Sequence, residues 1–365
     1  MSLLRGPDYP YRTNSLNMFR LILAAAVLFA HSFYIVGAGE GPHLHGENVG
    51  GWAVAGFFVI SGFLITRSRL RSDPGTYLLH RVARIFPAFI VCLVVTAFVF
   101  APIAALVERG SLTGFFTTPV TPFQYVWTNI TLYIDSYTIG QTLDTVPYPG
   151  AWNGSLWTLF YEFLCYVVIW VLGGIAAFRK GPLLAAVVFV ASVLIWIAIP
   201  LAQRVGLDES FYLAAKLIPY FLGGSLVFFV VDRFGMSRWV GIASLIAALA
   251  LIVLVPRWGG QAAAPFIAYG VLWLSTVVPQ PRWVAENDVS YGFYIYAWPV
   301  QQLVVLFGGA ALGLIPYMGV AAVATFALAW ASWVVVERRA MRLARPQAST
   351  PRRPPQAAPG GAPAV

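Results

Sequence analysis

Residues 16–37 read LNMFRLILAAAVLFAHSFYIVG, a mostly apolar run that is interrupted by Arg20 and His31. A helix needs about 20 apolar residues to cross a hydrocarbon core of about 30 Å, so this stretch is predicted to span a membrane. Similar segments follow along the chain, which predicts an all-α transmembrane bundle. About ten spanning helices are expected, at residues 16–37, 50–67, 85–107, 155–178, 183–202, 210–231, 238–255, 262–279, 290–308 and 314–337.

The composition excludes an ordinary soluble domain. Hydrophobic residues make up 59% of the 365-residue chain and charged residues only 10%, whereas soluble domains carry roughly 25% charged residues. The net charge of +9 is compatible with a nucleic-acid partner, but the basic residues cluster in alternate loops rather than in a stripe with interleaved aromatic residues. We therefore expect membrane lipids as partners and no nucleic acid.

The basic residues predict an orientation, because cytoplasmic loops of membrane proteins carry an excess of Lys and Arg. With a cytoplasmic N-terminus, only Arg109, Arg204 and Arg257 fall on the outer side. The inner side collects Arg5, Arg12, Arg67, Arg69, Arg71, Arg81, Arg84, Arg179, Lys180, Arg233, Arg238, Arg282, Arg338, Arg339, Arg342, Arg345, Arg352 and Arg353. Both termini are therefore predicted to be cytoplasmic.

The first apolar run faintly resembles a secretory signal, but the many spans after it favour a retained helix.

The chain divides into three predicted parts. A cytoplasmic segment at residues 1–15 precedes a membrane domain at residues 16–342, and a Pro/Ala-rich cytoplasmic tail at residues 343–365 has a composition that predicts disorder.

Between spans, residues 67–84 are basic and contain a turn signal before a short predicted amphipathic helix. Residues 108–154 form the longest outer loop, whose aromatic and amide side chains suit either carbohydrate or simple packing at the interface.

The two cysteines carry no predicted chemistry. Cys92 and Cys165 both fall inside apolar runs, where a thiol behaves as a small hydrophobic group. We expect neither a disulfide framework nor a catalytic thiol. No metal site is predicted.

Arg20 and His31 are candidate functional residues of the first span. They are eleven positions apart, so on a helix they lie about 20° apart around the axis and about 16 Å apart along it. One face would then offer a cation suited to phosphate or carboxylate and a deeper imidazole suited to proton transfer. The alternative is that Arg20 anchors the helix at the membrane surface and that His31 is a hydrogen-bonded core residue.

Two further patches lie in and after the second span. Ser61 and Gly62 are small residues, which allow another helix to approach closely or the helix to break locally. Arg81 and Arg84 are three residues apart and share a helical face at the predicted cytoplasmic boundary. Such a pair can bind phosphates, or it can serve as a surface anchor.

Ser155, Thr158 and Glu162 form a polar stripe on the otherwise apolar fourth span. A carboxylate inside a membrane needs a partner, and His31 or one of the arginines would serve. The alternative for Glu162 is a purely structural ion pair.

Together these patches resemble the membrane acyltransferase-3 family over residues 15–339. The resemblance rests on five ordered patches: Arg20 with His31 after ten residues, Phe57–Ile65, Arg81-x-x-Arg84 before Ile85 and Pro87, Leu156-Trp157-Thr158-Leu159 with Glu162, and Ser290-Tyr291-Gly292-Phe293-Tyr294-Ile295-Tyr296. The chain departs from the family pattern at Asn17, where Asp is frequent, at Thr158, where Ser is commoner, and at Ala297-Trp298, where many members carry a histidine.

The resemblance implies an enzyme that transfers an acyl group, commonly acetyl, from a cytoplasmic acyl-CoA such as acetyl-CoA. The acceptor would be a hydroxyl of a glycan, a lipid-linked saccharide or a small molecule beyond a bacterial inner membrane, with no tightly bound cofactor. His31 would act as general base or carry the acyl group, and Glu162 would orient it or stabilise its imidazolium. The acyl-CoA would be bound by Arg20, Arg81 and Arg84, with Ser61, Gly62, Thr158 and Tyr291 in supporting positions.

A transporter or flippase for a lipid-linked sugar is the main alternative, because transporters also use intramembrane His, Glu and Arg. Transporters commonly show repeated halves or paired helices broken by Gly or Pro, and the sequence has neither. A purely structural or sensing membrane protein would leave the arginine pair and Glu162 without a role.

Overall fold

The computed structural model describes residues 6–204 and 206–344. Within these residues the chain is mostly helical, which confirms the predicted class, and the strands form one short antiparallel hairpin. The elements follow in the order α1 (Leu16–Ile35), β1 (His43–Leu44), β2 (Glu47–Asn48), α2 (Val49–Arg71), α3 (Pro74–Val95), the π-helical η2 (Thr96–Phe100), α4 (Ala101–Arg109), α5 (Pro122–Asn129), α6 (Thr158–Leu172), α7 (Ala176–Lys180), α8 (Pro182–Gln203), α9 (Glu209–Phe234), α10 (Arg238–Leu254), α11 (Gly259–Ala262), α12 (Ala264–Val277), α13 (Arg282–Glu286), α14 (Ser290–Leu306), the 3-10 helix η3 (Gly309–Leu312), α15 (Leu314–Ser332), the π-helical η4 (Trp333–Glu337) and α16 (Arg338–Leu343).

Six helical runs in the described part of the chain are long and apolar enough to cross a membrane. They are Leu16–Ile35, Val49–Arg71, Pro74–Arg109, Pro182–Gln203, Glu209–Phe234 and Leu314–Leu343. The predicted count of about ten is not confirmed, because the other four predicted segments contain the shorter helices α6, α10, α12 and α14. Hydropathy marks apolar residues whether or not they are helical, and residues 155–157 and 173–175, for example, form turns at the two ends of α6.

Residues 67–84, the first of the two long connecting stretches, differ in structure from the prediction. Asp73 accepts a hydrogen bond from the backbone N–H of Thr76 and Pro74 follows it, a combination typical of a helix start. The helix then continues through Pro87 and η2 until α4 ends before Gly110, which has a positive φ of 68°. The predicted amphipathic segment is therefore the beginning of the third long helix rather than a separate element.

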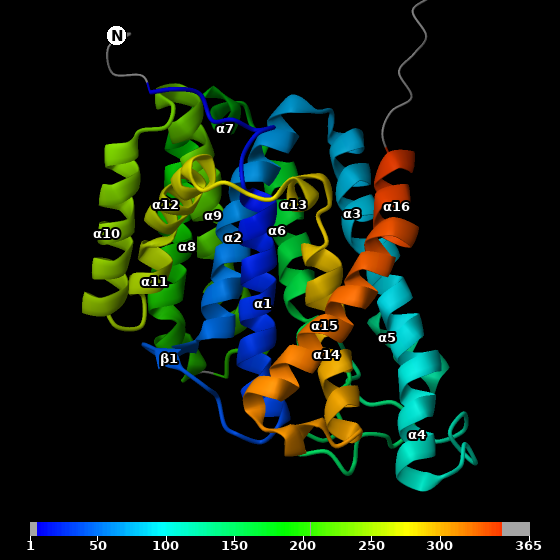
Figure 1. Cartoon of the computed structure of the whole chain (residues 1–365). Helices are drawn as coiled ribbons and strands as arrows, with labels where there is room; N and C mark the ends of the chain where they lie inside the picture. Colours follow the sequence, from blue (N-terminus) through cyan, green and yellow to red (C-terminus); the bar gives the residue numbers. More distant parts are fainter. Residues whose placement is uncertain (1–5, 205, 345–365) are drawn as a thin grey trace, which may run out of the picture.

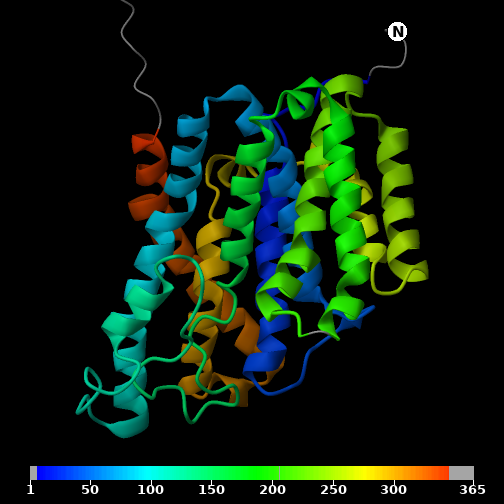
Figure 2. The ribbon, with the colours of Figure 1, turned by 180° about the vertical axis from the view of Figure 1, so that it is seen from behind.

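The helices run roughly side by side between two ends of the molecule (Figure 1). Helix α1 lies near the centre and packs against α2 and α14. Helices α8, α9, α10 and α12 stand on one side of it, and α3, α4, α15 and α16 stand on the other. Seen from behind, the long connection between α4 and α6 loops across the lower left of the molecule, beside α4 (Figure 2).

Helices α2 and α9 cross in direct backbone contact. A Cβ atom on Gly62 would lie 1.9 Å from the carbonyl oxygen of Phe221, and one on Gly224 would meet a backbone carbonyl of α2 at 2.0 Å. The hydroxyls of Thr66 and Ser225 are hydrogen-bonded at 2.8 Å in the same crossing. Small and hydroxyl residues favour helix association in membranes for these reasons, as predicted for Gly62.

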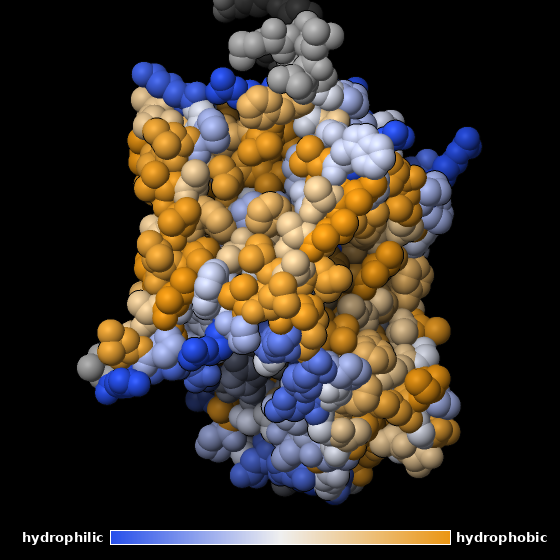
Figure 3. Space-filling model, turned by 90° about the vertical axis from the view of Figure 1, so that its left-hand side faces the viewer, coloured by the Kyte–Doolittle hydropathy of each residue, from blue (hydrophilic) through white to orange (hydrophobic). Residues whose placement is uncertain are grey.

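The surface has a broad apolar belt between two polar ends (Figure 3). Leu183, Leu254, Ile315 and Val323 are each more than 70% exposed on outward helix faces. A continuous apolar surface of this kind is unfavourable in water and favourable against lipid. The molecule is an integral membrane protein.

The two ends differ in charge. We call the upper end of Figure 1 the basic end; there α2 ends, α3 begins and α16 ends. These elements carry Arg67, Arg69, Arg71, Arg338, Arg339 and Arg342. We call the other end the loop end; it holds the hairpin β1–β2 and residues 110–157.

The predicted N-terminal segment packs on the bundle where the structure describes it. The hydroxyls of Tyr9 and Ser275 are 2.8 Å apart, and the Tyr11 ring lies under the guanidinium of Arg67 at 3.7 Å. Most of the predicted disordered tail, residues 345–365, lies outside the described residues.

Candidate active site

Three cavities follow one another along α1. The basic-end cavity has a volume of about 250 Å³, the middle cavity about 30 Å³ and the loop-end cavity about 360 Å³. The basic-end cavity is lined by Arg20, Ser61, His80, Arg81, Arg84 and Tyr166 among others, the middle cavity by Arg20, Phe57, Glu162, Tyr291 and Tyr294, and the loop-end cavity by His31, Glu47, Lys216 and Trp298.

Neighbouring cavities share wall residues. Arg20 lines both the basic-end and the middle cavity. Val54, Thr158 and Tyr294 line both the middle and the loop-end cavity. The cavities therefore form one row from Arg20 to His31, as expected for two side chains that share a helix face.

Two of the predicted arginines share one carboxylate. Nη1 of Arg20 and Nη2 of Arg84 each donate to Oδ2 of Asp288 at 2.6 Å. Asp288 lies between α13 and α14, and Ser290 donates to its other oxygen. Burial alone would raise the pKa of Asp288, but the two guanidinium groups and the bonds from Ser290 hold it well below its usual range. Arg20 and Arg84 are thus fixed in position at the wall of the basic-end cavity.

Glu337 extends this network at the end of η4. Its Oε2 lies 3.8 Å from Nη1 of Arg84, and its Oε1 accepts a hydrogen bond from Ser332 at 3.0 Å. The side chain is 2% exposed. Arg84 consequently contacts two acidic side chains, one from the connection between α13 and α14 and one from η4.

Arg81 is the cation of the basic-end cavity that has no acidic partner among the described residues. Its guanidinium lies 5.8 Å from the ring centroids of Tyr77 and Tyr166, and its buried Nε atom has no protein hydrogen-bond partner. An unpaired donor at a cavity wall is suited to an anionic ligand.

Glu162 has partners other than those predicted. Its Oε1 accepts hydrogen bonds from Ser61 at 2.8 Å and from Tyr166 at 2.6 Å. In the described residues it forms no hydrogen bond with His31, which lines a different cavity. The expected partners were His31 or one of the arginines, and among the described residues Glu162 forms a hydrogen bond or salt bridge with none of them, because it lies at the level of Ser61, whereas His31 lies closer to the loop end of the bundle.

His31 is held against Trp298. The two ring centroids are 4.7 Å apart with an interplanar angle of 71°, and Nε1 of Trp298 donates to the carbonyl of Ala151 at 2.8 Å. Tyr148 packs on Trp298 with ring centroids 5.4 Å apart. The Nδ1 atom of His31 is buried and has no protein hydrogen-bond partner. The imidazole is therefore positioned by a ring contact rather than by a carboxylate.

The late Ser-Tyr patch faces the same row of cavities. The Tyr294 hydroxyl donates to the carbonyl of Ser155 at 2.9 Å and is also hydrogen-bonded to Thr158. Tyr291 donates to the carbonyl of Ile85 at 2.8 Å and lines the middle cavity. Tyr294 and Thr158 thus form the wall between the middle and the loop-end cavity.

Comparison with known families identifies the chain. The acyltransferase domain of the acyltransferase-3 family matches residues 13–334. The chain belongs to this family. The predicted enzyme class, an O-acyltransferase, is thereby confirmed.

Two relatives resemble this acyltransferase over most of their length. The "O-acetyl transferase" of Shigella phage Sf6 is 29% identical over 349 residues, which cover 93% of this chain and 99% of the relative. "Nodulation protein 10" of Rhizobium leguminosarum bv. viciae is 27% identical over 376 aligned positions, covering 90% of this chain and 94% of the relative. No solved structure gives a significant match.

Sequence reasoning missed several residues of the acyltransferase's candidate site. Asp288 lies two residues before the Ser290–Tyr296 patch. Arg20 and Arg84 needed an acidic partner, and an aspartate beside the start of a predicted helix was the available signal for one. Trp298 was noted only as a departure from the family pattern, although it is the ring that contacts His31. Tyr166 carries no separate signal, because an aromatic residue inside an apolar helix is ordinary.

Proposed function

We propose that this acyltransferase moves an acetyl group from acetyl-CoA to a hydroxyl of a glycan. The donor binds at the basic end and the acceptor enters from the loop end. The observation that carries this proposal is the row of cavities that joins three arginines at one end to His31 near the other. The family match and the name of the phage relative support the acetyl group.

In this proposal the basic end faces the cytoplasm, so that both termini are cytoplasmic. The arginines of α2 and α16 gather at this end, and basic residues are favoured on the cytoplasmic side of membranes. Because the named relatives belong to a bacteriophage and a bacterium, we assign the enzyme to a bacterial inner membrane.

Arg81 is the main contact for the phosphates of the donor. Its Nε atom has no protein hydrogen-bond partner, and charge-assisted hydrogen bonds between arginine and phosphate are about twice as strong as neutral ones. Arg20 and Arg84 face the same cavity but are already paired with Asp288, so they add positive potential with less freedom to rearrange.

The thioester must then pass the middle cavity to reach His31. A volume of about 30 Å³ holds about one water molecule, so passage of the pantetheine arm requires the walls to move. Phe57 and Tyr294 form an edge-to-face pair at this constriction, with ring centroids 5.9 Å apart. Their side chains are the ones that we expect to shift when the donor binds.

His31 carries the chemistry in this proposal. As general base it removes the proton of the acceptor hydroxyl, the oxygen bonds to the acetyl carbon, and the C–S bond breaks. The proton then passes to the sulfur of CoA, and His31 is returned to its neutral form. In the second variant a ring nitrogen of His31 bonds to the acetyl carbon as the C–S bond breaks and CoA leaves as a thiolate. The acceptor oxygen then bonds to the acetyl carbon as the N–C bond breaks, and the hydroxyl proton passes to the CoA thiolate.

Glu162 is a positioning residue in this proposal. It accepts hydrogen bonds from Ser61 and Tyr166, which both line the basic-end cavity. It therefore shapes the path of the donor toward the middle cavity. Its negative charge also attracts Arg81, although the two side chains form no salt bridge or hydrogen bond in the described part of the chain.

The test is a transfer assay with purified protein in lipid nanodiscs, radiolabelled acetyl-CoA, and glycan isolated from a strain that lacks the protein. Wild type should label the glycan, and His31→Gln should abolish labelling. His43→Gln is the matched control, because His43 lines the same cavity but is paired with Glu40 at 2.7 Å. Near-normal transfer by His31→Gln would exclude both variants, and an acetylated His31 trapped before acceptor addition would select the second.

A further inference from the structure

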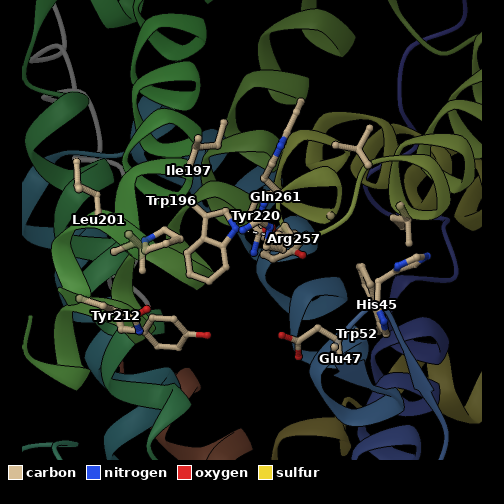
Figure 4. A pocket seen from close by; sticks show the side chains of 18 of the residues that line it. His45, Glu47, Trp52, Trp196, Ile197, Leu201, Tyr212, Tyr220, Arg257 and Gln261 are labelled. Atoms are coloured by element: carbon tan, nitrogen blue, oxygen red, sulfur yellow. Dashed lines mark hydrogen bonds between the residues drawn. The ribbon is translucent and has the colours of Figure 1, made fainter.

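A fourth cavity, at the loop end, is the largest of those near the site, with a volume of about 570 Å³ (Figure 4). We call it the aromatic cavity, because Trp52, Trp196, Tyr212, Tyr220 and Trp258 line it. It lies between the loop-end termini of α2, α8, α9 and α10, the short helix α11 and the β1–β2 hairpin. The proposed transfer reaction has so far given it no role.

The rings of this cavity are held in place by the protein. Nε1 of Trp196 donates to the carbonyl of Arg257 at 3.0 Å, and the ring packs on Tyr212 with centroids 5.4 Å apart. Nε1 of Trp52 donates to the carbonyl of Leu44 at 3.2 Å. Since the indole N–H groups are bonded to backbone, the rings offer their apolar faces and edges to a ligand.

Polar groups stand among the rings. Glu47 belongs to β2 and Tyr212 to α9. Figure 4 shows the Glu47 carboxylate and the Tyr212 hydroxyl both directed into the open space between these two elements. Gln261 is 4% exposed and lines the cavity near Lys216, whose carbonyl it contacts at 3.3 Å. Ring faces beside a few fixed polar groups are the usual composition of a specific small-ligand site.

An ion pair separates this cavity from the one that contains His31. Oε1 of Glu47 lies 2.5 Å from Nζ of Lys216. Glu47 lines both the aromatic and the loop-end cavity, and Lys216 lines the loop-end cavity together with His31. A ligand in the aromatic cavity would therefore be next to the space in front of the imidazole.

We propose that the aromatic cavity binds the saccharide of the acceptor, with one pyranose ring against Trp196 and Tyr212. This inference rests on the proposed function. A pyranose ring has apolar C–H faces that pack on aromatic rings and hydroxyls that bond to carboxylate and amide groups. The Glu47–Lys216 pair then orients the neighbouring sugar, so that its hydroxyl enters the loop-end cavity beside His31.

The cavity also has an apolar side. Ile197 and Leu201 of α8 line it and are 42% and 68% exposed on the surface belt, and Ile252 of α10 lines it as well. A saccharide that is attached to a lipid could enter from this side, whereas a free saccharide would enter from the loop end. Both acceptors share the pyranose chemistry that the rings recognise.

The test measures how transfer depends on acceptor concentration, using oligosaccharides released from the glycan of a strain that lacks the protein. Trp196→Ala and Tyr212→Ala should each raise the half-saturating oligosaccharide concentration about tenfold, the factor expected for a lost ring contact. Their KM for acetyl-CoA should not change, which also shows that the variants are folded. Trp196→Phe retains a ring face and should stay within about threefold of wild type.

Trp127→Ala is the matched control. Trp127 is 76% exposed on α5 and lines none of the four cavities. A second arm repeats the comparison with lipid-linked saccharide in membranes of the same strain. A larger effect of Trp196→Ala there assigns the lipid-linked form as the acceptor, and a larger effect with free oligosaccharides assigns the soluble form.

The inference is overturned if Trp196→Ala and Tyr212→Ala leave the half-saturating concentration of both acceptors unchanged. It is also overturned if they raise the KM for acetyl-CoA instead. The proposed function would survive either result as long as wild type labels the glycan and His31→Gln does not. Conversely, a wild-type enzyme that labels no glycan would remove the proposed function itself.

Discussion

The His31 imidazole meets the Trp298 ring edge to face, with centroids 4.7 Å apart. Trp298 is in turn fixed by its bond to the carbonyl of Ala151 and by the ring of Tyr148. The long connection between α4 and α6 thus supports the side chain that we propose to be catalytic. A histidine that is oriented by packing needs no carboxylate partner to select its direction.

Replacement of Trp298 should therefore impair transfer without affecting donor binding. Trp298→Ala removes the ring that limits the motion of His31, so kcat should fall about tenfold to a hundredfold, because small losses of orientation are costly to catalysis. Trp298→Phe retains a ring and should lose much less. Kinetics with acetyl-CoA and glycan would check this, and a rise in acetyl-CoA KM with unchanged kcat would contradict it.

Arg81→Ala should weaken donor binding. Loss of a charged hydrogen bond costs about 1.5–3 kcal/mol, so the KM for acetyl-CoA should rise at least about tenfold while kcat changes little. Arg71→Ala is a matched control, because Arg71 is exposed at the end of α2 and does not line the basic-end cavity. Equal effects of the two variants would show that the arginines act only through the general potential of the basic end.

Asp288→Asn should destabilise the fold near neutral pH. The change leaves Arg20 and Arg84 without their shared carboxylate, and breaking a buried pair costs about 3 kcal/mol or more. Thermal unfolding in detergent, with Asp144→Asn as a control for the same change at an exposed carboxylate, would measure the loss. An unchanged Tm would mean that the two arginines find other partners.

The effect of Asp288→Asn on Tm should depend on pH. The pKa of Asp288 in the folded protein lies below its usual value, which is about 3.9 in an unfolded chain. The ionised Asp288 therefore stabilises the folded state in full when the pH is above its unfolded-state pKa, and this stabilisation is lost as the pH falls through the folded-state pKa. The Tm difference between wild type and Asp288→Asn should be constant from about pH 5 upward and should narrow in stronger acid.

Gly62→Ala should separate α2 from α9. The new Cβ would overlap the carbonyl oxygen of Phe221, and overpacking of this kind costs about 1–3 kcal/mol or more. Gly319→Ala on α15 is the control, because nothing lies within 4 Å of a Cβ at that position. A drop in Tm for the first variant alone is expected, and equal Tm values would contradict the close crossing.

Several features could be predicted from local patterns. Apolar runs predicted helices in a membrane, and each predicted span contains a helix. Arg20 and His31 were expected on one face because a helix repeats every 3.6 residues, and both line the same row of cavities. The five family patches lie around that row, and the predicted acyltransferase family is confirmed.

Other features depend on contacts between residues far apart in the chain, which local spacing does not encode. Asp288 and Arg84 are more than 200 positions apart, as are Trp298 and His31, so neither contact has a periodic signal in the sequence. Glu162 accepts hydrogen bonds from two hydroxyl groups because the packing of α6 on α2 places it at the level of Ser61 along the bundle. The aromatic cavity likewise arises only where α2, α8, α9, α10 and α11 meet the hairpin.

The sequence by itself thus determined that the protein lies in lipid, that it is helical, which family it belongs to and which helix faces carry charge. Those properties follow from hydrophobicity and from the fixed geometry of the helix. Tertiary structure alone decided which charges are neutralised, which ring supports His31 and where cavities open. These properties depend on the relative heights and rotations of packed helices, which are set by side-chain volumes summed over the whole bundle.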